Sequence, residues 1–182
     1  NLLDYLPFVI LLLASGVFAV AEIAKERLAV RRGPTKRALA GIITGIVSVV
    51  LAGTAVVGLA LTFLEFREQY VFPVLVETSF IWFMLYELVL VTLTVLLYEV
   101  FFRGLVQLSW LRGFGLWSVV FQTGLFFGLF FLSQAISWQM APLLIFCPFA
   151  GLIAERSQSI WYSFIASWIF LFLTDIFFLI FH

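Results

Sequence analysis

Charge is scarce in this sequence: 11% of its 182 residues are Asp, Glu, Lys or Arg, whereas 64% are hydrophobic. A water-soluble domain of this length could not cover its surface with so few charges, so a soluble globular protein is excluded. The apolar residues form long runs without a ten-residue alternating pattern, which excludes an outer-membrane barrel and predicts membrane-spanning helices. The formal net charge is zero, so the expected surroundings are a lipid bilayer and no nucleic-acid partner is expected.

Cysteine and histidine are almost absent as well. The single cysteine, Cys147, excludes an internal disulfide and cannot build a metal site by itself. The single histidine, His182, lies at the far end of the last apolar run. The sequence has no HExxH, P-loop, CxxC or GxSxG pattern, so no metal and no cofactor is expected. The first residue is Asn1 rather than methionine, which indicates that something upstream is missing or was removed.

The apolar runs predict an all-α integral membrane protein with about six transmembrane helices. Between the first two runs lies a basic loop, residues 25–37, with six of the ten Lys and Arg residues. We expect a two-helix membrane hairpin over residues 1–70, a polar loop at 65–70, a short broken segment at 71–79, and a helical membrane domain over residues 71–182. The predicted spans are residues 5–24, 38–64, 80–102, 115–132, 140–154 and 160–181.

Short basic loops stay in the cytoplasm, so the loop 25–37 is predicted to be cytoplasmic. Alternation of six spans then also places Arg103, Arg112 and Arg156 on the cytoplasmic side. Tryptophan favours membrane interfaces, and the tryptophans fit this orientation. The tryptophans expected at the outer boundary are Trp82 and Trp138, and those expected at the inner boundary are Trp110, Trp117 and Trp161. The predicted location is the plasma membrane of a prokaryote.

Two pairs of glycines are spaced for close helix packing. Gly41 and Gly45 lie four residues apart in the second span, and Gly124 and Gly128 lie four apart in the fourth. Small residues at this spacing let another helix approach closely. That helix can belong to this chain or to a partner, and the sequence leaves both open.

The stretch Tyr98-Glu99-Val100-Phe101-Phe102-Arg103-Gly104 holds a carboxylate and a guanidinium near the end of a long apolar run. On a helix, Glu99 and Arg103 are four residues apart and lie on one face, so they can pair directly. A lone charge in a membrane helix costs about 2.5–3.5 kcal/mol on insertion scales. We therefore expect the two charges to neutralise each other and to face protein or water.

Three segments resemble the CAAX-protease and bacteriocin-processing family of intramembrane glutamic proteases. They are YEVFFRG at 98–104, FGLFF at 127–131 and SIWYS at 159–163, within a region from about Phe80 to Phe178. The resemblance implies a protease-like helical bundle. Glu99 and Arg103 match the second glutamate and the arginine of the first motif. Other residues stand at the catalytic positions: Tyr98 for the first glutamate, Phe131 and Ser167 for two histidines, and Leu171 for an asparagine or aspartate.

These replacements predict that no catalytic site is intact. Tyrosine, with a pKa of about 10, is a poor base at neutral pH, and phenylalanine cannot carry a proton. Ser167 can donate one hydrogen bond, which is a fragment of an oxyanion site. The predicted function is therefore that of a pseudoenzyme: a scaffold, regulator or accessory subunit that binds another membrane protein.

Two other functions remain open. One is a divergent intramembrane glutamic endopeptidase that uses Glu99 as its base. The other is a carrier of ions or small molecules that uses Glu87, Glu99 and Asp175. The sequence does not decide whether Glu87 and Asp175 share a pocket.

Overall fold

The computed structural model describes residues 36–133 and 138–181, and every structural statement below concerns those residues. They form helices joined by short connections, which confirms the predicted all-α class. The predicted first span and nearly all of the basic loop lie outside the described residues. The helices are α2 (Lys36–Thr62), α3 (Leu64–Gln69), α4 (Val74–Thr78), α5 (Phe80–Leu85), η2 (Tyr86–Val91), α6 (Thr92–Tyr98), η3 (Glu99–Trp110), α7 (Leu116–Leu132), η4 (Trp138–Met140), α8 (Ala141–Ser157) and α9 (Ile160–Phe181).

Four helical stretches of the described chain are long and apolar enough to cross a membrane. They match the predicted second, third, fifth and sixth spans. The predicted fourth span is α7, a shorter apolar helix of 17 residues. At 1.5 Å per residue, α7 is about 26 Å long, which is close to the thickness of a bilayer's hydrocarbon core. The four stretches are Arg37–Thr62, Phe80–Trp110, Trp138–Ser157 and Ile160–Phe181.

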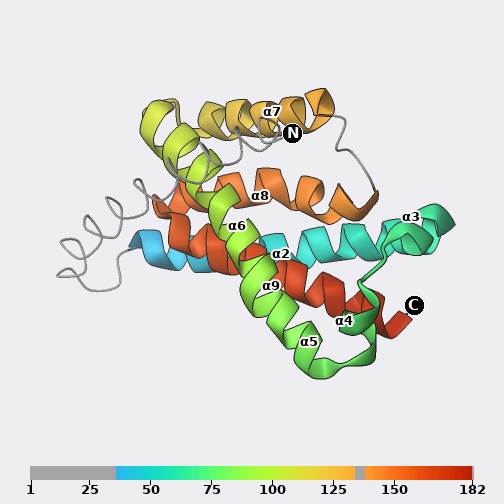
Figure 1. Ribbon diagram of the computed structural model, residues 1–182. Helices are drawn as coiled ribbons and strands as arrows, with labels where there is room; N and C mark the ends of the chain where they lie inside the picture. Colours follow the sequence, from blue (N-terminus) through green and yellow to red (C-terminus); the bar gives the residue numbers. More distant parts are fainter. Residues whose placement is uncertain (1–35, 134–137, 182) are drawn as a thin grey trace, which may run out of the picture.

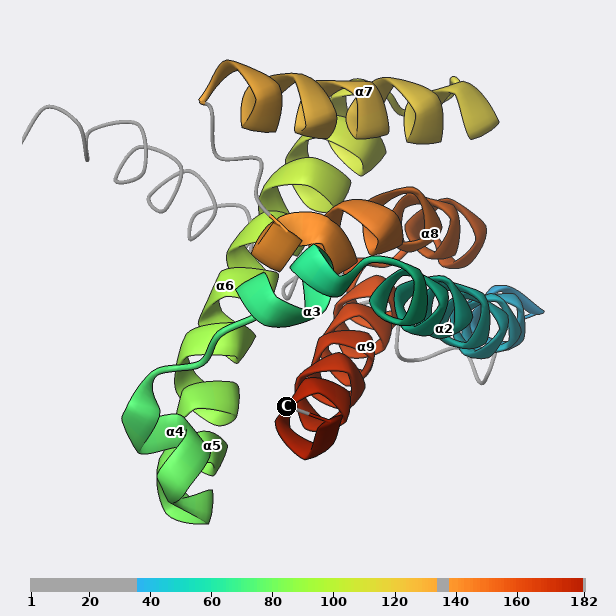
Figure 2. The ribbon, with the colours of Figure 1, turned by 90° about the vertical axis from the view of Figure 1, so that its right-hand side faces the viewer.

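Helix α8 lies at the centre of the bundle. It packs against α2, α7, α9 and η3. Helices α5, η2, α6 and η3 follow one another without a break and form one long helix that crosses the bundle obliquely (Figures 1 and 2). Its η2 and η3 parts are π-helical, an arrangement often found at functional sites. Helix α2, from the predicted hairpin, packs on α8 and α9 of the predicted C-terminal domain.

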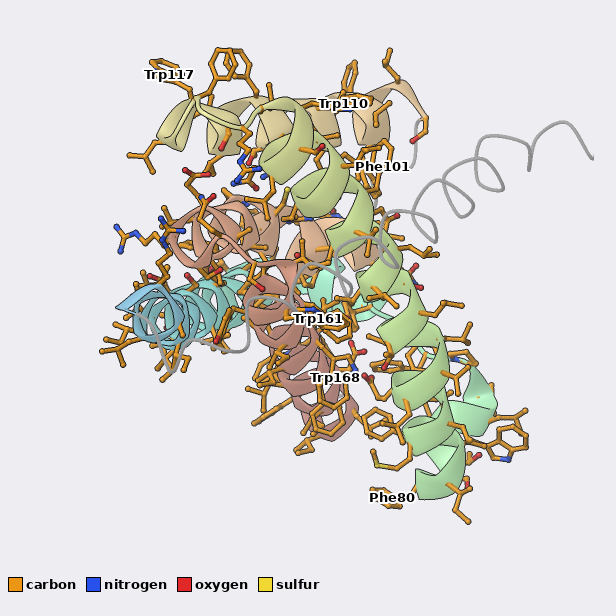
Figure 3. The ribbon with its side chains drawn as sticks, turned by 90° about the vertical axis from the view of Figure 1, so that its left-hand side faces the viewer. Phe80, Phe101, Trp110, Trp117, Trp161 and Trp168 are labelled. Carbon is orange, nitrogen blue, oxygen red and sulfur yellow. The ribbon has the colours of Figure 1, made fainter. Side chains whose placement is uncertain are left out.

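One end of the bundle gathers the basic turns. The start of α2, the turn after η3 and the turn between α8 and α9 all lie at the left of Figure 1. Figure 3 looks at the molecule from this end, where Trp110, Trp117 and Trp161 are labelled. This grouping is the one that the predicted topology requires. The assignment of this end to the cytoplasm stays a prediction.

The predicted polar loop at 65–70 is wrong, because most of it is helix α3. Its Phe66 is fully buried, and the ring centroid of Phe66 lies 5.2 Å from that of Phe178 and 5.6 Å from that of Trp138. This apolar contact explains why a segment rich in charged residues folds onto the bundle. Within the predicted broken segment, α4 begins directly after Pro73.

Two predicted spans end too early. The third span continues beyond residue 102 to Trp110, because Arg103 and Gln107 are buried against α8 instead of marking a wet loop. Helix α8 continues beyond residue 154 to Ser157. Its last turn is held by polar contacts: Glu155 accepts a hydrogen bond of 3.1 Å from Ser118, and Arg156 donates one of 3.4 Å to Thr44.

Candidate functional site

The carboxylate of Glu99 lies at the start of η3, where 2% of the residue is exposed. Ser163 and Ser167 of α9 each donate a hydroxyl hydrogen bond of 2.6 Å to it, one to each carboxylate oxygen. The two serines are four residues apart, so they share one face of α9. The distances are typical of a hydroxyl bound to a carboxylate. Both carboxylate oxygens of Glu99 are thus held by the protein.

Arg103 lies on the same face of the long helix, and its Nε atom is 3.8 Å from Oε1 of Glu99. Its Nη2 atom donates a hydrogen bond of 3.0 Å to the backbone carbonyl of Cys147 in α8. The guanidinium also lies 5.9 Å from the ring centroid of Phe126 in α7. Arg103 therefore ties η3 to both α7 and α8, and the predicted ion pair with Glu99 is present.

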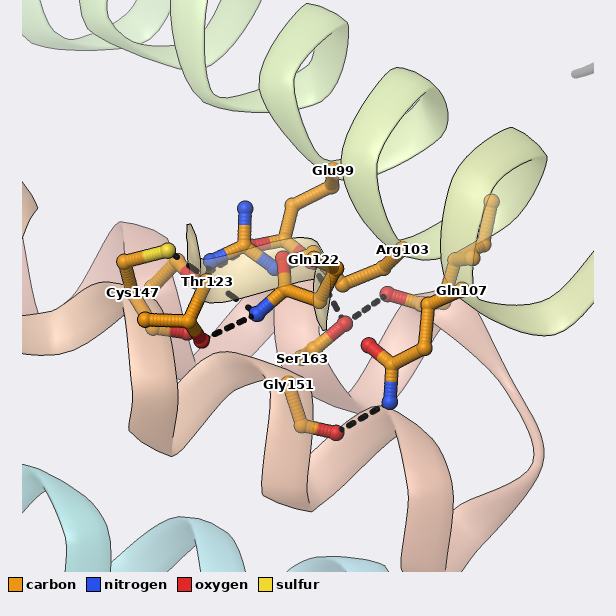
Figure 4. A network of polar contacts seen from close by, with 10 residues as sticks. Glu99, Arg103, Gln107, Gln122, Thr123, Cys147, Gly151 and Ser163 are labelled. Carbon is orange, nitrogen blue, oxygen red and sulfur yellow. Dashed lines mark hydrogen bonds and ion pairs between the residues drawn. The ribbon is translucent and has the colours of Figure 1, made fainter. Parts of the chain in front are cut away.

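Two glutamine side chains continue this polar layer (Figure 4). Gln107 donates a hydrogen bond of 2.8 Å to the carbonyl of Gly151, and Gln122 donates one of 2.8 Å to the hydroxyl of Thr123. A Cβ atom on Gly151 would lie 2.6 Å from Nε2 of Gln122 and 3.4 Å from Oε1 of Gln107. Because that space is taken, only glycine fits at position 151 with both amides in place.

Tyr98, next to Glu99, packs into an aromatic cluster. Its ring centroid lies 5.7 Å from that of Phe126 and 6.0 Å from that of Phe130. Phe131, which the sequence aligned with a catalytic histidine, lies away from this cluster and is 74% exposed. The buried face of α7 repeats every four residues, so Phe130 lies on it and Phe131 does not. That face carries Ser118, Gln122, Phe126 and Phe130.

The resemblance also named Ser167 and Leu171, and these two residues lie in different parts of the structure. Ser167 contacts Glu99, whereas Leu171, one turn further along α9, lines a cavity of about 250 Å³ beside Asp175. Neither this cavity nor the one of about 240 Å³ between α2 and α9 is lined by Glu99. The structure therefore brings Tyr98, Glu99, Arg103 and Ser167 together and leaves Phe131 and Leu171 apart from them.

Sequence reasoning missed Ser163 and Gln107, which complete the polar layer. A signal for both was present. Gln107 follows Arg103 at the same four-residue interval that separates Arg103 from Glu99, and Ser163 precedes Ser167 by four residues. A search for polar residues repeated at this spacing would have found both.

A second buried acidic cluster lies nearer the opposite end of the bundle. The hydroxyl of Tyr70, just after α3, donates a hydrogen bond to Oδ1 of Asp175 in α9. Glu87 of η2 is 0% exposed, and its carboxyl group forms a side-chain hydrogen bond with that of Asp175. No other group among the described residues donates to its oxygens. Burial and the nearby Asp175 carboxylate raise the pKa of Tyr70 above its ordinary value, so Tyr70 remains a neutral donor.

The two glycine pairs differ in their surroundings. A Cβ atom on Gly41 would lie 2.7 Å from Cβ of Ser157, and one on Gly45 would lie 3.7 Å from Cβ of Ala166. This pair thus lies against α8 and α9. A Cβ atom on Gly124 or Gly128 of α7 would have no neighbour within 4 Å in the described part of the chain.

The fold and this polar layer define a helical integral membrane protein with a buried Glu–Arg pair facing serines of its last helix. A family model described as type II CAAX prenyl endopeptidase Rce1-like matches residues 78–173, just over half of the chain. The chain belongs to this family. No curated protein and no solved structure matches it. Within residues 36–133 and 138–181, no group of three His, Cys, Asp or Glu side chains is placed to hold a metal ion.

Proposed function

We propose that this protein is a catalytically inactive member of its family that acts as a scaffold, regulator or accessory subunit of a membrane protein complex. One observation carries the proposal: both carboxylate oxygens of Glu99 are occupied by the hydroxyls of Ser163 and Ser167. A general base must reach a water molecule and take its proton. A buried carboxylate that already accepts bonds on both oxygens is suited to holding two helices together instead.

The surroundings of Tyr98 support the same proposal. The family resemblance implies a catalytic glutamate at this position, whereas in this chain the phenol ring of Tyr98 packs against Phe102, Phe126 and Phe130. A phenol ring packed against three phenylalanines offers no carboxylate that could take a proton from water. The guanidinium of Arg103 is also already bonded, because it donates a hydrogen bond to the carbonyl of Cys147. The polar layer thus stabilises the packing of η3 against α8 and α9.

A cleavage assay tests whether the protein is inactive. The purified chain in lipid nanodiscs would be incubated with a farnesylated peptide ending in a CAAX sequence, together with the variants Glu99→Gln and Glu77→Gln. Glu77, in α4, is an exposed carboxylate and serves as the matched control. We expect no turnover above that of empty nanodiscs in any of the three. Turnover that Glu99→Gln abolishes and Glu77→Gln retains would establish the alternative function, a divergent glutamic endopeptidase.

A second experiment tests the scaffold role. The open glycine notch of α7, Gly124 and Gly128, is the proposed contact with a helix of another membrane protein. Cross-linking in native membranes, followed by purification, should recover one membrane protein in a fixed ratio to this chain. The variant with both glycines changed to leucine should no longer recover this partner protein. Gly58→Leu, on α2, is the matched control, because a Cβ atom there also has no neighbour within 4 Å, and it should still recover the partner protein. A chain that purifies alone from cross-linked membranes would contradict the proposal.

A further inference from the structure

A groove runs between α2 and α9, and we call it the α2–α9 groove. The two helices lie side by side (Figures 1 and 2), and the groove contains a cavity of about 240 Å³. It opens to the outside of the bundle, where Leu173 is 50% exposed. Its lining includes Val49, Gly53 and Val57 of α2 and Leu173 and Phe177 of α9.

The α2–α9 groove is apolar and allows close approach. Thr174 contributes a hydroxyl to its lining, and this hydroxyl donates a hydrogen bond of 2.9 Å to the carbonyl of Phe170 in its own helix. A Cβ atom on Gly53 would meet nothing within 4 Å in the described part of the chain. Small residues in a membrane helix let another helix approach closely, and van der Waals packing then favours their association. Such a groove suits an apolar helix.

The sequence predicts an apolar helix that is tethered beside this groove. The predicted first span, residues 5–24, precedes the described residues and is joined to α2 through residues 25–35. When extended, a connection of this length reaches about 36 Å. A helix with its side chains is about 10–12 Å wide, so the connection is long enough to place the first span on either side of α2. A short loop on one side of the membrane makes the two helices antiparallel.

We propose that the predicted first span packs into the α2–α9 groove, antiparallel to α2. Gly53 lies fifteen positions after residue 38, where the predicted second span begins, and Val9 lies fifteen positions before residue 24, where the first span ends. Gly53 and Val9 are therefore at about the same depth in the membrane. The residues from Phe8 to Leu13 all have large apolar side chains, which suit the open space beside Gly53.

This packing gives the N-terminal hairpin a role in the family domain. The family match begins at residue 78, so both helices of the hairpin precede it. Helix α9 supplies Ser163 and Ser167, which hold the carboxylate of Glu99. With the first span in the groove, the hairpin holds α9 in place from outside the family domain. The notch of α7 is left free for another protein.

Disulfide cross-linking of the full chain in its native membrane tests the proposal. A site for a sequence-specific protease is inserted within residues 25–35, so that cleavage separates the first span from α2 unless a disulfide joins them. In a Cys147→Ser background, Gly53→Cys is paired in turn with a single cysteine at each position from 8 to 15. A disulfide needs Cα atoms within about 7 Å of each other. The matched control is Leu51→Cys, which is 54% exposed and does not line the groove.

We expect Gly53→Cys to join the two fragments at one or two positions between residues 8 and 11, and Leu51→Cys to join them at none. Val49, one turn before Gly53, also lines the groove and fixes the direction of packing. In an antiparallel pair, the best partner of Val49→Cys lies about four positions later, between residues 12 and 15. This second probe decides the question even if Gly53→Cys does not fold.

Three outcomes would overturn the proposal. Efficient cross-linking by Leu51→Cys would place the first span on another face of α2. Cross-links between two differently tagged chains expressed together, instead of within one chain, would make a second copy the occupant of the groove. If neither Val49→Cys nor Gly53→Cys forms a cross-link in a folded protein, lipid chains fill the groove.

Discussion

Two buried acidic clusters lie along the same pair of helices and differ in how they are partnered. Glu99 meets Ser163, Ser167 and Arg103, and both of its oxygens are bonded. Twelve residues earlier, about 18 Å along the same long helix, Glu87 is fully buried, and the Asp175 carboxyl is its one hydrogen-bond partner among the described residues. Both clusters are buried, so burial alone does not distinguish them.

The number of partners does distinguish them. A carboxylate whose oxygens are all bonded by its own protein contributes to packing, and changing it leaves other buried groups without partners. A carboxyl group with a single partner contributes less to packing, and changing it leaves fewer buried groups unbonded. The comparison therefore predicts that the cluster at Glu99 contributes more to stability than the cluster at Asp175.

The largest expected effect concerns the Glu99 cluster. Arg103→Met should lower the free energy of unfolding by about 3–5 kcal/mol, because it leaves the buried Glu99 carboxylate without its cation. It also leaves the carbonyl of Cys147 without the donor that Arg103 supplies. Unfolding in mixed detergent and sodium dodecyl sulfate micelles measures this. The matched control is Arg67→Met, in the exposed part of α3, which should change stability little. A loss below about 1 kcal/mol in Arg103→Met would remove the distinction between the clusters.

The next effect concerns Tyr70, whose hydroxyl donates to Asp175 in the second cluster. Tyr70→Phe should cost about 1.5–3 kcal/mol, the contribution of a hydrogen bond to a charged group. Tyr162→Phe is the control, because the hydroxyl of Tyr162 makes no hydrogen bond with the described residues.

The same variant should alter the response to alkaline pH. Burial first, and the Asp175 carboxylate second, raise the pKa of Tyr70 above its ordinary value of 10.0. The unfolded chain then releases this proton at a lower pH than the folded one. The stability that Tyr70 contributes is therefore complete below about pH 10 and is lost as the pH rises above that value. Unfolding measured from pH 8 to pH 11 should show a loss in the unchanged protein that is smaller in Tyr70→Phe. Equal slopes would mean that Tyr70 is not buried against Asp175.

Residue patterns predicted the helical class, five of the described spans and the Glu99–Arg103 pair, because hydropathy and four-residue spacing act within one segment. They failed at α3, where Phe66 is buried by Phe178, a residue more than a hundred positions away. They also placed Phe131 by alignment, whereas the packing of α7 turns Phe130 inward. Contacts such as that between Ser163 and Glu99 join separate helices, so only the assembled bundle shows them.

A glycine of the first cluster gives a smaller effect. Gly151→Ala should destabilise the protein by about 1–3 kcal/mol, the usual cost of overpacking, because the added Cβ would lie 2.6 Å from Nε2 of Gln122 and 3.1 Å from Cγ1 of Val119. Gly128→Ala is the matched control on α7, where the added atom meets nothing within 4 Å. It should be neutral or stabilising by up to about 1 kcal/mol. If the Gly151→Ala protein is as stable as the Gly128→Ala protein, the side chains of Gln107 and Gln122 move aside without a measurable loss of stability.

The smallest effect belongs to Glu87, and it is the sharpest test of the comparison. Glu87→Met replaces a buried carboxyl group by an apolar side chain of similar length and removes one hydrogen bond within the described chain, that with the Asp175 carboxyl, which keeps the hydroxyl of Tyr70 as a donor. The free energy of unfolding should change by less than about 1 kcal/mol in either direction, since the lost hydrogen bond is offset by removing a buried polar group from beside another carboxyl. Glu99→Met, the same chemical change twelve residues later, should be strongly destabilising, because Arg103, Ser163 and Ser167 all lose their shared partner. Both variants are compared by the same unfolding titration. If they lose stability equally, the single contact of Glu87 with Asp175 contributes as much to packing as the three contacts of Glu99, and the difference between the two clusters disappears.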